Sequence, residues 1–168
     1  MDDDRLIPKI LHSEYEESPF SGCTMCGEAL RDFSEGFQIS KVFRRGECVF
    51  EYALCMPCRD RMAEDFSEES VAAMEKFHDE NIEAGHGLEE CACCHRESSE
   101  WPEPEFSLVA ACLHDALLDG IMVCIDCTEA MQGLLSKQTK DRRDRFIEEN
   151  FPCAPDETAP VPSGVGML

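Results

Sequence analysis

The amino-acid sequence predicts an α+β fold built from two related units. The first observation is a set of four short cysteine pairs, each with two residues between its outer cysteines. The second is their spacing, because 28 residues (27–54) separate the first two pairs and 29 residues (95–123) separate the last two. The third is that in both units an alternating apolar pattern precedes the second pair and helical spacing follows it. The pairs are Cys23 and Cys26, Cys55 and Cys58, Cys91 and Cys94, and Cys124 and Cys127.

The two units keep a common register along the chain. A shift of 69 residues, the distance from Cys55 to Cys124, also superposes Met62 on Met131 and Phe77 on Phe146. The first pairs of the two units need a shift of 68, and one inserted residue between positions 101 and 106 reconciles the two values. We interpret this correspondence as an internal duplication.

The register also selects among the remaining cysteines. Cys93 and Cys94 both follow Cys91, but only Cys94 matches the spacing of the other pairs. We therefore expect Cys94 to act with Cys91, and Cys93 to be its neighbour. Cys48 and Cys112 are predicted to be small buried apolar residues, and Cys153 an exposed thiol in the tail.

Each unit is predicted to contain a β-hairpin followed by helices. The first hairpin comprises residues 37–43 and 49–54, and the second comprises 106–113 and 121–123 with a turn region at Asp119-Gly120. The second cysteine pair then opens a helix, and Ser67 and its counterpart Ser136 are predicted helix caps. The apolar helix residues need burial, and we expect them to pack the units together about a pseudo-twofold axis. They are Met62, Phe66, Met131 and Leu135.

These patterns divide the chain into four parts. Residues 1–20 form an acidic N-terminal arm, 21–84 the first unit, 85–151 the second unit, and 152–168 a proline-rich tail that we expect to be disordered. A unit of about sixty residues gains only marginal stability from its hydrophobic core. A structural metal ion supplies the missing free energy, because site assembly and folding are then one event.

The order of knuckle, hairpin and helix resembles the treble-clef zinc finger over residues 21–84 and 89–151. The resemblance implies two treble-clef-like units, each with a zinc knuckle, a β-hairpin and a helix, and two structural zinc ions. Four sulfurs complete the tetrahedron around each ion and leave no open position for catalysis. The implied ligands are Cys23, Cys26, Cys55 and Cys58 for one ion, and Cys91, Cys94, Cys124 and Cys127 for the other. The family does not specify a function, since its members include binding modules, enzymes and scaffolds.

Two other classes of site use the same residues. The sequence Cys23-Thr-Met-Cys26-Gly27 also resembles the iron-binding knuckle of rubredoxins, which would make the protein an electron carrier. Against this, Arg59, His95 and Thr128 follow the other pairs, where rubredoxin knuckles have glycine. A thiol–disulfide enzyme with one exposed pair is the other alternative, but no βαβ scaffold is predicted for it. We expect a protein with no catalytic residues.

The charge of the chain bears on its partners. A formal net charge of −21 repels phosphate backbones and disfavours nucleic-acid binding, although it also simply aids solubility. The basic run 137–145 is a local exception, and we interpret it as a solvated helix face with internal ion pairs. A protein partner of basic character is the hypothesis that the charge supports.

The sequence also favours a particular compartment. The start, residues 1–5, lacks the features of a signal peptide, and the most apolar stretch, 107–124, is interrupted by His114, Asp115 and Asp119. We therefore expect no membrane span and a reducing cytoplasm, where paired cysteines bind metal rather than form disulfides. The sequence does not specify an oligomeric state.

Overall fold

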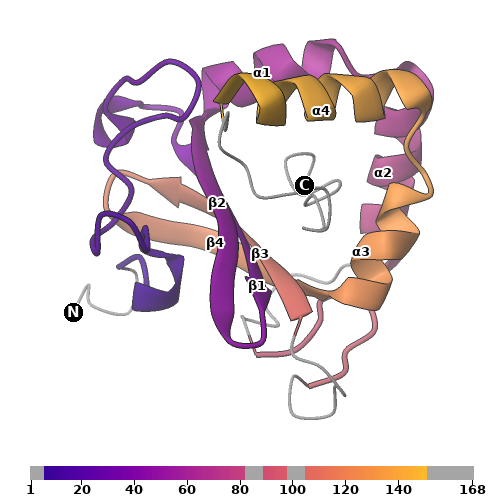
Figure 1. Cartoon of the computed structure of the whole chain (residues 1–168), viewed down its shortest axis with the longest axis horizontal. Helices are drawn as coiled ribbons and strands as arrows, with labels where there is room; N and C mark the ends of the chain where they lie inside the picture. The colour runs from indigo at the N-terminus through magenta and orange to yellow at the C-terminus, as the bar shows by residue number, and fades with distance from the viewer. Residues whose placement is uncertain (1–5, 82–88, 98–104, 151–168) are drawn as a thin grey trace.

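The centre of the computed structural model is one four-stranded antiparallel sheet that both units share (Figure 1). The strand order is β2-β1-β3-β4, so each hairpin contributes two neighbouring strands and the hairpins meet where β1 pairs with β3. The predicted α+β class is confirmed. The strands are β1 (Phe37–Arg44), β2 (Glu47–Cys55), β3 (Glu105–Leu113) and β4 (Ala116–Cys124).

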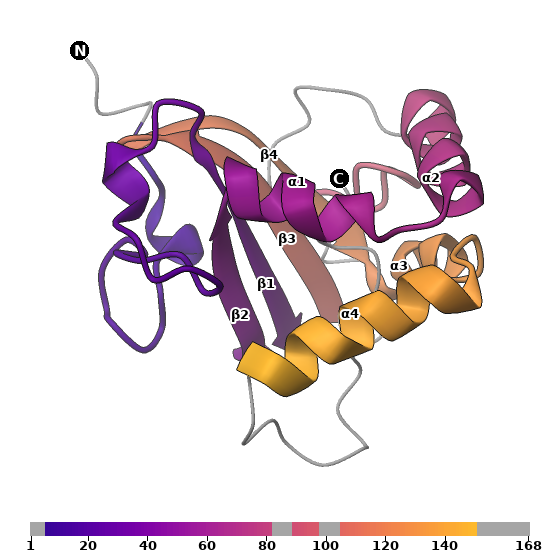
Figure 2. The ribbon, with the colours of Figure 1, turned by 90° about the horizontal axis from the view of Figure 1, so that it is seen from above.

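Helices gather on one side of this sheet, as Figures 1 and 2 show from two directions. Each hairpin leads directly into a short helix, and a longer helix follows. The structure describes residues 6–81, 89–97 and 105–150. In this part of the chain, no helix combines the length and hydropathy needed to cross a bilayer. The helices are α1 (Met56–Glu64), α2 (Glu68–Asn81), α3 (Ile125–Gln132) and α4 (Lys137–Asn150).

The pairing of β1 with β3 has the register that a twofold relation between the units requires. Phe37 pairs with Cys112, and Phe43 pairs with Phe106, which is the counterpart of Phe37 after the 69-residue shift. Ser40 pairs with Val109, its own counterpart. A pseudo-twofold axis therefore passes between these two residues. Without this pairing, each two-stranded hairpin would have marginal stability by itself.

A second junction lies where the two longer helices begin. The Oγ atoms of Ser67 and Ser136 are 2.7 Å apart, and these two residues are again counterparts. The backbone N–H of Ser67 donates to Oγ1 of Thr139 (3.0 Å), and the N–H of Ser136 donates to Oγ of Ser70 (2.8 Å). Each serine also caps its own helix, since it accepts a hydrogen bond from the N–H of Ser70 or Thr139.

The junction between units differs from the expected packing of helices alone. Met62 and Phe66 belong to one buried cluster, and Met131 and Leu135 belong to another. The two units are joined by the strand pairing, by the hydroxyl groups at the helix starts and by the longer helices, since Phe146 of α4 lies in the first cluster and Met74 of α2 in the second. Each edge of a hairpin carries unpaired N–H and C=O groups, and pairing β1 with β3 satisfies one edge of each hairpin.

The second hairpin is longer than predicted. Its turn lies at His114 and Asp115, and Asp119-Gly120 lies inside β4. His114 has a positive φ of 55°, the same value as its counterpart Arg45 in the turn of the first hairpin. The prediction of the turn at Asp119-Gly120 is therefore wrong, because these two residues pair with Ala111 and Ala110 inside the β3–β4 ladder.

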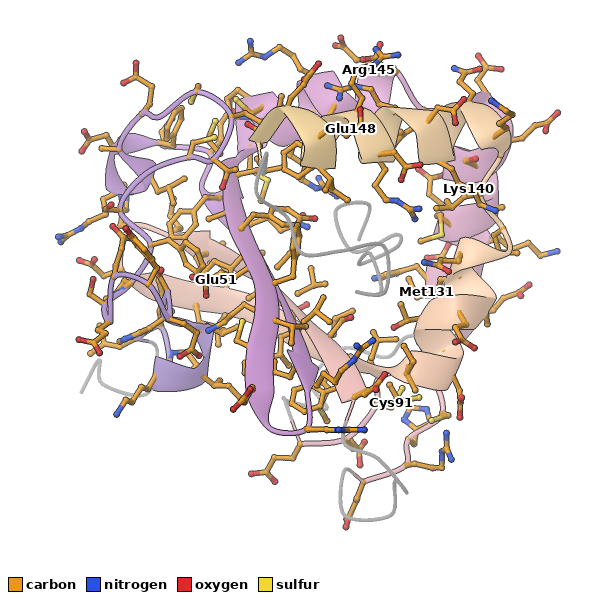
Figure 3. All side chains as sticks on the ribbon, viewed as in Figure 1. Glu51, Cys91, Met131, Lys140, Arg145 and Glu148 are labelled. Atoms are coloured by element: carbon orange, nitrogen blue, oxygen red, sulfur yellow. The ribbon has the colours of Figure 1, made fainter. Side chains whose placement is uncertain are left out.

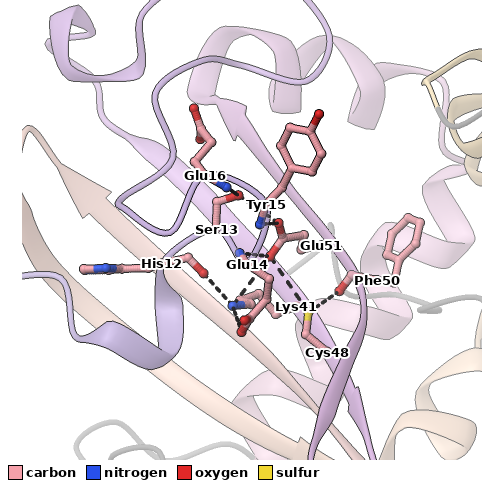
Figure 4. Close-up of polar contacts among 9 residues, drawn as sticks. All are labelled: His12, Ser13, Glu14, Tyr15, Glu16, Lys41, Cys48, Phe50 and Glu51. Atoms are coloured by element: carbon pink, nitrogen blue, oxygen red, sulfur yellow. Dashed lines mark hydrogen bonds and ion pairs between the residues drawn. The ribbon is translucent and has the colours of Figure 1, made fainter.

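The segment that precedes the first unit lies on the sheet face opposite the helices. Ile7 and Leu11 are buried, and the fully buried Lys41 of β1 donates through Nζ to the carbonyl oxygen of His12. Its ammonium group also lies 3.0 Å from Oε1 of Glu14 and 3.5 Å from Oε2 of Glu51 (Figure 4). These contacts fasten the segment to the first unit. The predicted tail, 152–168, lies outside the described residues.

Candidate metal centres

The first cysteine pair of each unit lies in a tight turn held by backbone hydrogen bonds. In the first unit, the N–H of Gly27 donates to the carbonyl oxygen of Cys23 (2.8 Å), and the N–H of Cys23 donates to that of Glu28 (2.9 Å). Gly27 has a φ of +75°, a conformation in which glycine avoids the strain that a side chain causes. The turn directs the backbone N–H groups around the sulfur of Cys23.

The second unit repeats this turn with different side chains. The N–H of His95 donates to the carbonyl oxygen of Cys91 (2.9 Å), and the N–H of Cys91 donates to that of Arg96 (3.0 Å). His95 adopts a φ of +63° at the position of Gly27. The 68-residue shift between the first pairs therefore holds for the backbone geometry as well as for the cysteines.

The second pair of each unit lies where a strand becomes a helix. Cys55 ends β2 and caps α1, and its N–H donates to Sγ of Cys23 at 3.4 Å. Cys124 ends β4 and caps α3, and its N–H donates to Sγ of Cys91, also at 3.4 Å. A helix start carries partial positive charge, which favours an ionised thiol. Burial outweighs this effect and raises the pKa of both Cys55 and Cys124.

The structure brings the eight predicted ligand residues together in two groups of four. Within each group, the sulfur atoms all lie within 4.8 Å of one another. Sγ of Cys26 is 3.8 Å from Sγ of Cys55, and Sγ of Cys94 is 3.7 Å from Sγ of Cys124. A tetrahedral ion with four metal–sulfur bonds of about 2.3 Å separates its sulfurs by about 3.8 Å. Each group can therefore hold one metal ion.

The thiols in a group differ in how well their ionised form is stabilised. Burial acts to raise the pKa of Cys23, but backbone N–H groups, chiefly those of Cys26 and Cys55, lower it to about 7. A hydrogen bond from the Cys93 side chain, together with backbone N–H groups, lowers the pKa of Cys91 to about 3. Burial raises the pKa of Cys58 and of Cys127. The first cysteine of each turn is thus the best prepared to bind a cation.

Arginine side chains contact both groups, and the sequence analysis did not identify them. In the first group, Nη2 of Arg61 donates to Sγ of Cys58 (3.3 Å) from helix α1. In the second, Arg96 lies in the turn and donates to Sγ of Cys94 (3.5 Å) and of Cys124 (3.8 Å). The counterparts of these arginines are Ala130 and Glu28, so the two contacts are not equivalent under the register of the units. Both arginines place positive charge beside the sulfurs. Such charge is favourable because four thiolates around a dication would leave a net charge of −2.

Three other cysteines, Cys48, Cys93 and Cys112, lie in the described residues outside the two groups of four. Cys93 is half-buried beside Cys91, and the hydrogen bond that it donates to the Cys91 sulfur raises the pKa of Cys93. Cys112 is fully buried, and burial raises its pKa to about 12. Cys48 is half-buried, and its Sγ donates to the carbonyl oxygen of Phe50 (3.4 Å). Cys153 lies outside the described residues.

The fold and the two cysteine groups are the features that define the class of this protein. No protein-family model, curated protein or solved structure matches this chain. The chain is an α+β protein with one four-stranded antiparallel sheet and two four-cysteine groups, each of which can hold a metal ion.

Proposed function

We propose that each four-cysteine group holds one structural zinc ion in a treble-clef-like unit. The observation that carries this proposal is the close approach of four sulfur atoms in each group, all within 4.8 Å of one another. Four thiolate ligands in a tetrahedral arrangement are typical of zinc. The ligands are the eight residues named above, from Cys23 to Cys127.

The ion has a structural task in this arrangement. It joins the turn at the start of a unit to the junction of strand and helix, which are far apart in sequence. Zinc supplies bonds to four sulfurs and no redox chemistry. Since four sulfurs fill the coordination sphere, no position remains for a substrate or an activated water. We therefore propose a non-enzymatic role.

That role is contact with another protein, and the surface supports it in two ways. The net charge of −21 favours a partner with a basic surface. Leu6 and Leu118 are exposed at 51% and 62%. Leu118 belongs to β4, and Leu6 pairs with Ala116 at the start of that strand. A contiguous exposed apolar patch rimmed by polar residues marks an interaction site.

Metal analysis of the purified protein tests the proposal. The expected result is two zinc ions per chain and eight thiols that resist alkylation until a strong chelator is added. A red protein with iron and visible absorption would instead indicate an electron carrier. A folded, metal-free protein with one rapidly reacting thiol pair would indicate thiol–disulfide chemistry.

A further inference from the structure

Tyr15 is the most exposed large side chain of apolar character in the described part of the chain. Its exposed fraction is 95%, whereas that of the next, Leu118, is 62%. A single exposed apolar side chain is common on a protein surface and by itself indicates nothing. Tyr15 is different because hydrogen bonds fix the backbone that carries it.

Residues 13–18 form a closed loop that carries Tyr15, and we name it the Tyr15 loop. The N–H of Ser13 donates to the carbonyl oxygen of Ser18, and the N–H of Glu17 donates to that of Ser13, both at 2.9 Å. Oγ of Ser13 also accepts a hydrogen bond from the N–H of Glu16 (3.1 Å). The loop is thus closed on itself, which limits the conformations open to its backbone.

The Tyr15 loop is also tied to the sheet through one carboxylate of β2. Oε1 of Glu51 accepts a hydrogen bond from Oγ of Ser13 (2.9 Å), and Oε2 accepts one from the N–H of Glu14 (3.0 Å). Nζ of the fully buried Lys41 contacts both Oε2 of Glu51 (3.5 Å) and Oε1 of Glu14 (3.0 Å). Figure 4 shows the ring of Tyr15 pointing away from this buried ammonium group. The fold therefore holds the ring in solvent on an anchored loop.

The carboxylates that flank Tyr15 differ in what they contact. Glu14 is engaged by the buried ammonium group. The carboxylate of Glu16 accepts hydrogen bonds from the N–H (3.2 Å) and from Oγ of Ser21. Glu17 is exposed, and its carboxylate has no ion pair or hydrogen bond within the described residues. The Glu17 carboxylate is therefore available to a cation that approaches the ring from outside.

We propose that the Tyr15 loop docks an arginine side chain on an extended basic segment of a partner protein, an inference that rests on the basic partner proposed above. The guanidinium group lies over the ring of Tyr15, because the face of an aromatic ring attracts a cation. It also pairs with the carboxylate of Glu17. Arginine suits both contacts because its guanidinium group is planar and carries several donors. A loop that is already ordered loses little conformational entropy on binding.

This docking point is separate from the exposed leucines. The Tyr15 loop is fastened to β2, whereas Leu118 belongs to β4. These two strands are the opposite edges of the sheet. The Tyr15 loop and the surface at Leu118 can therefore be tested separately as places of contact.

An NMR titration of the purified full chain, with its metal content measured beforehand, tests this proposal. The probe is a short glycine peptide with two arginines, and the control peptide has uncharged citrulline in place of both. We expect the arginine peptide to shift the backbone amides of Tyr15 and Glu17 with a Kd in the millimolar range. The citrulline peptide should bind at least about fivefold more weakly, since it lacks the charge that the ring and the carboxylate attract.

Two pairs of variants locate the contact. Tyr15→Ala should weaken binding of the arginine peptide about threefold or more, whereas Tyr15→Phe, which keeps the ring, should stay within about twofold of the unmodified chain. Glu17→Gln should weaken binding about threefold. Glu148→Gln, an equal change of charge on the exposed side of α4 (Figure 3), should leave it unchanged. All four substitutions are at exposed positions, so thermal denaturation should show that the fold is kept.

The outcomes separate this inference from the proposed function. Tyr15→Phe binding as weakly as Tyr15→Ala, or equal effects of the Glu17 and Glu148 variants, would overturn the docking of arginine at the Tyr15 loop. Shifts at Leu118 without shifts in the loop would also overturn it, but would leave the basic partner in place. If a chain with two zinc ions did not bind the arginine peptide at all, both the docking and the basic partner would be rejected, and the structural zinc sites would stand.

Discussion

The two units have the same backbone around their cysteines but differ in many of the side chains that surround this framework. In both, the N–H of the strand-ending cysteine lies 3.4 Å from the sulfur of the first cysteine, and the turn hydrogen bonds agree within 0.1 Å. The first unit adds the buried Lys41 with its acidic partners and the aromatic packing of Tyr52. The second has a small cavity beside Ile121. The backbone around the cysteines is therefore the part under geometric constraint, and the two units differ in the side chains that surround it.

Removal of the metal should have the largest effect on the stability of the two units. Structural zinc contributes about 10 kcal/mol or more to the stability of a small zinc-binding unit. We therefore expect a strong chelator to unfold both units together, because one sheet joins them. Circular dichroism during the titration measures this. Two separate transitions would contradict a single shared fold.

Removal of one ligand from either group should have the next largest effect. Cys58→Ala and Cys127→Ala are each expected to reduce the metal content from two ions to one per chain, and to lower the melting temperature of the whole chain. Metal analysis and thermal denaturation measure the two effects. Cys93→Ala is the matched control and should keep both ions. If Cys93→Ala lost an ion and Cys94→Ala did not, the selection of Cys94 by register would be wrong.

The hydroxyl groups on the pseudo-twofold axis allow a symmetric comparison. Ser67→Ala and Ser136→Ala each remove a helix cap and one partner of the 2.7 Å hydrogen bond. A lost cap costs about 1–2 kcal/mol. We expect losses of similar size in denaturant unfolding. The double variant should cost less than the sum of the two, since both single changes break the same contact.

Alkaline pH should destabilise the folded protein through the ionisation of the buried Tyr52. The pKa of Tyr52 is raised to about 12 by burial, above its value near 10 in an unfolded chain. The neutral phenol therefore contributes stability that is fully present below pH 10 and is lost as the pH rises through 12. Ultraviolet titration of the native protein and of Tyr52→Phe isolates this ionisation. Titration of Tyr52 near pH 10 in the folded protein would contradict its burial.

The arginines near the sulfurs should give the smallest effects. Arg61→Ala and Arg96→Ala each remove one positive group from one cysteine group, at 3.3 Å and 3.5 Å from the nearest sulfur. We expect each variant to release metal a few-fold faster from its own site only, because the site keeps all four thiolates. Competition with a coloured chelator measures the rates. Faster release from the opposite site would show that the contacts do not act locally.

The sequence alone predicted that eight cysteines assemble in two groups of four, because their spacing is short-range and repeated. It also predicted the order of hairpin and helix and the caps at Ser67 and Ser136, which depend on local preferences. It did not predict the pairing of β1 with β3, since an edge-to-edge contact leaves no periodic pattern in either strand. Likewise, Arg61 and Arg96 reach the sulfurs from unrelated positions. Such contacts depend on three-dimensional proximity that neither spacing nor composition encodes.

X-ray absorption at the metal edge of the purified protein tests whether the two cysteine groups are equivalent tetrahedral metal sites. The expected result is zinc with four sulfur neighbours at about 2.3 Å and no nitrogen or oxygen in the first shell, with two ions per chain. A first shell with nitrogen or oxygen ligands, or one ion per chain, would contradict the equivalence of the two units.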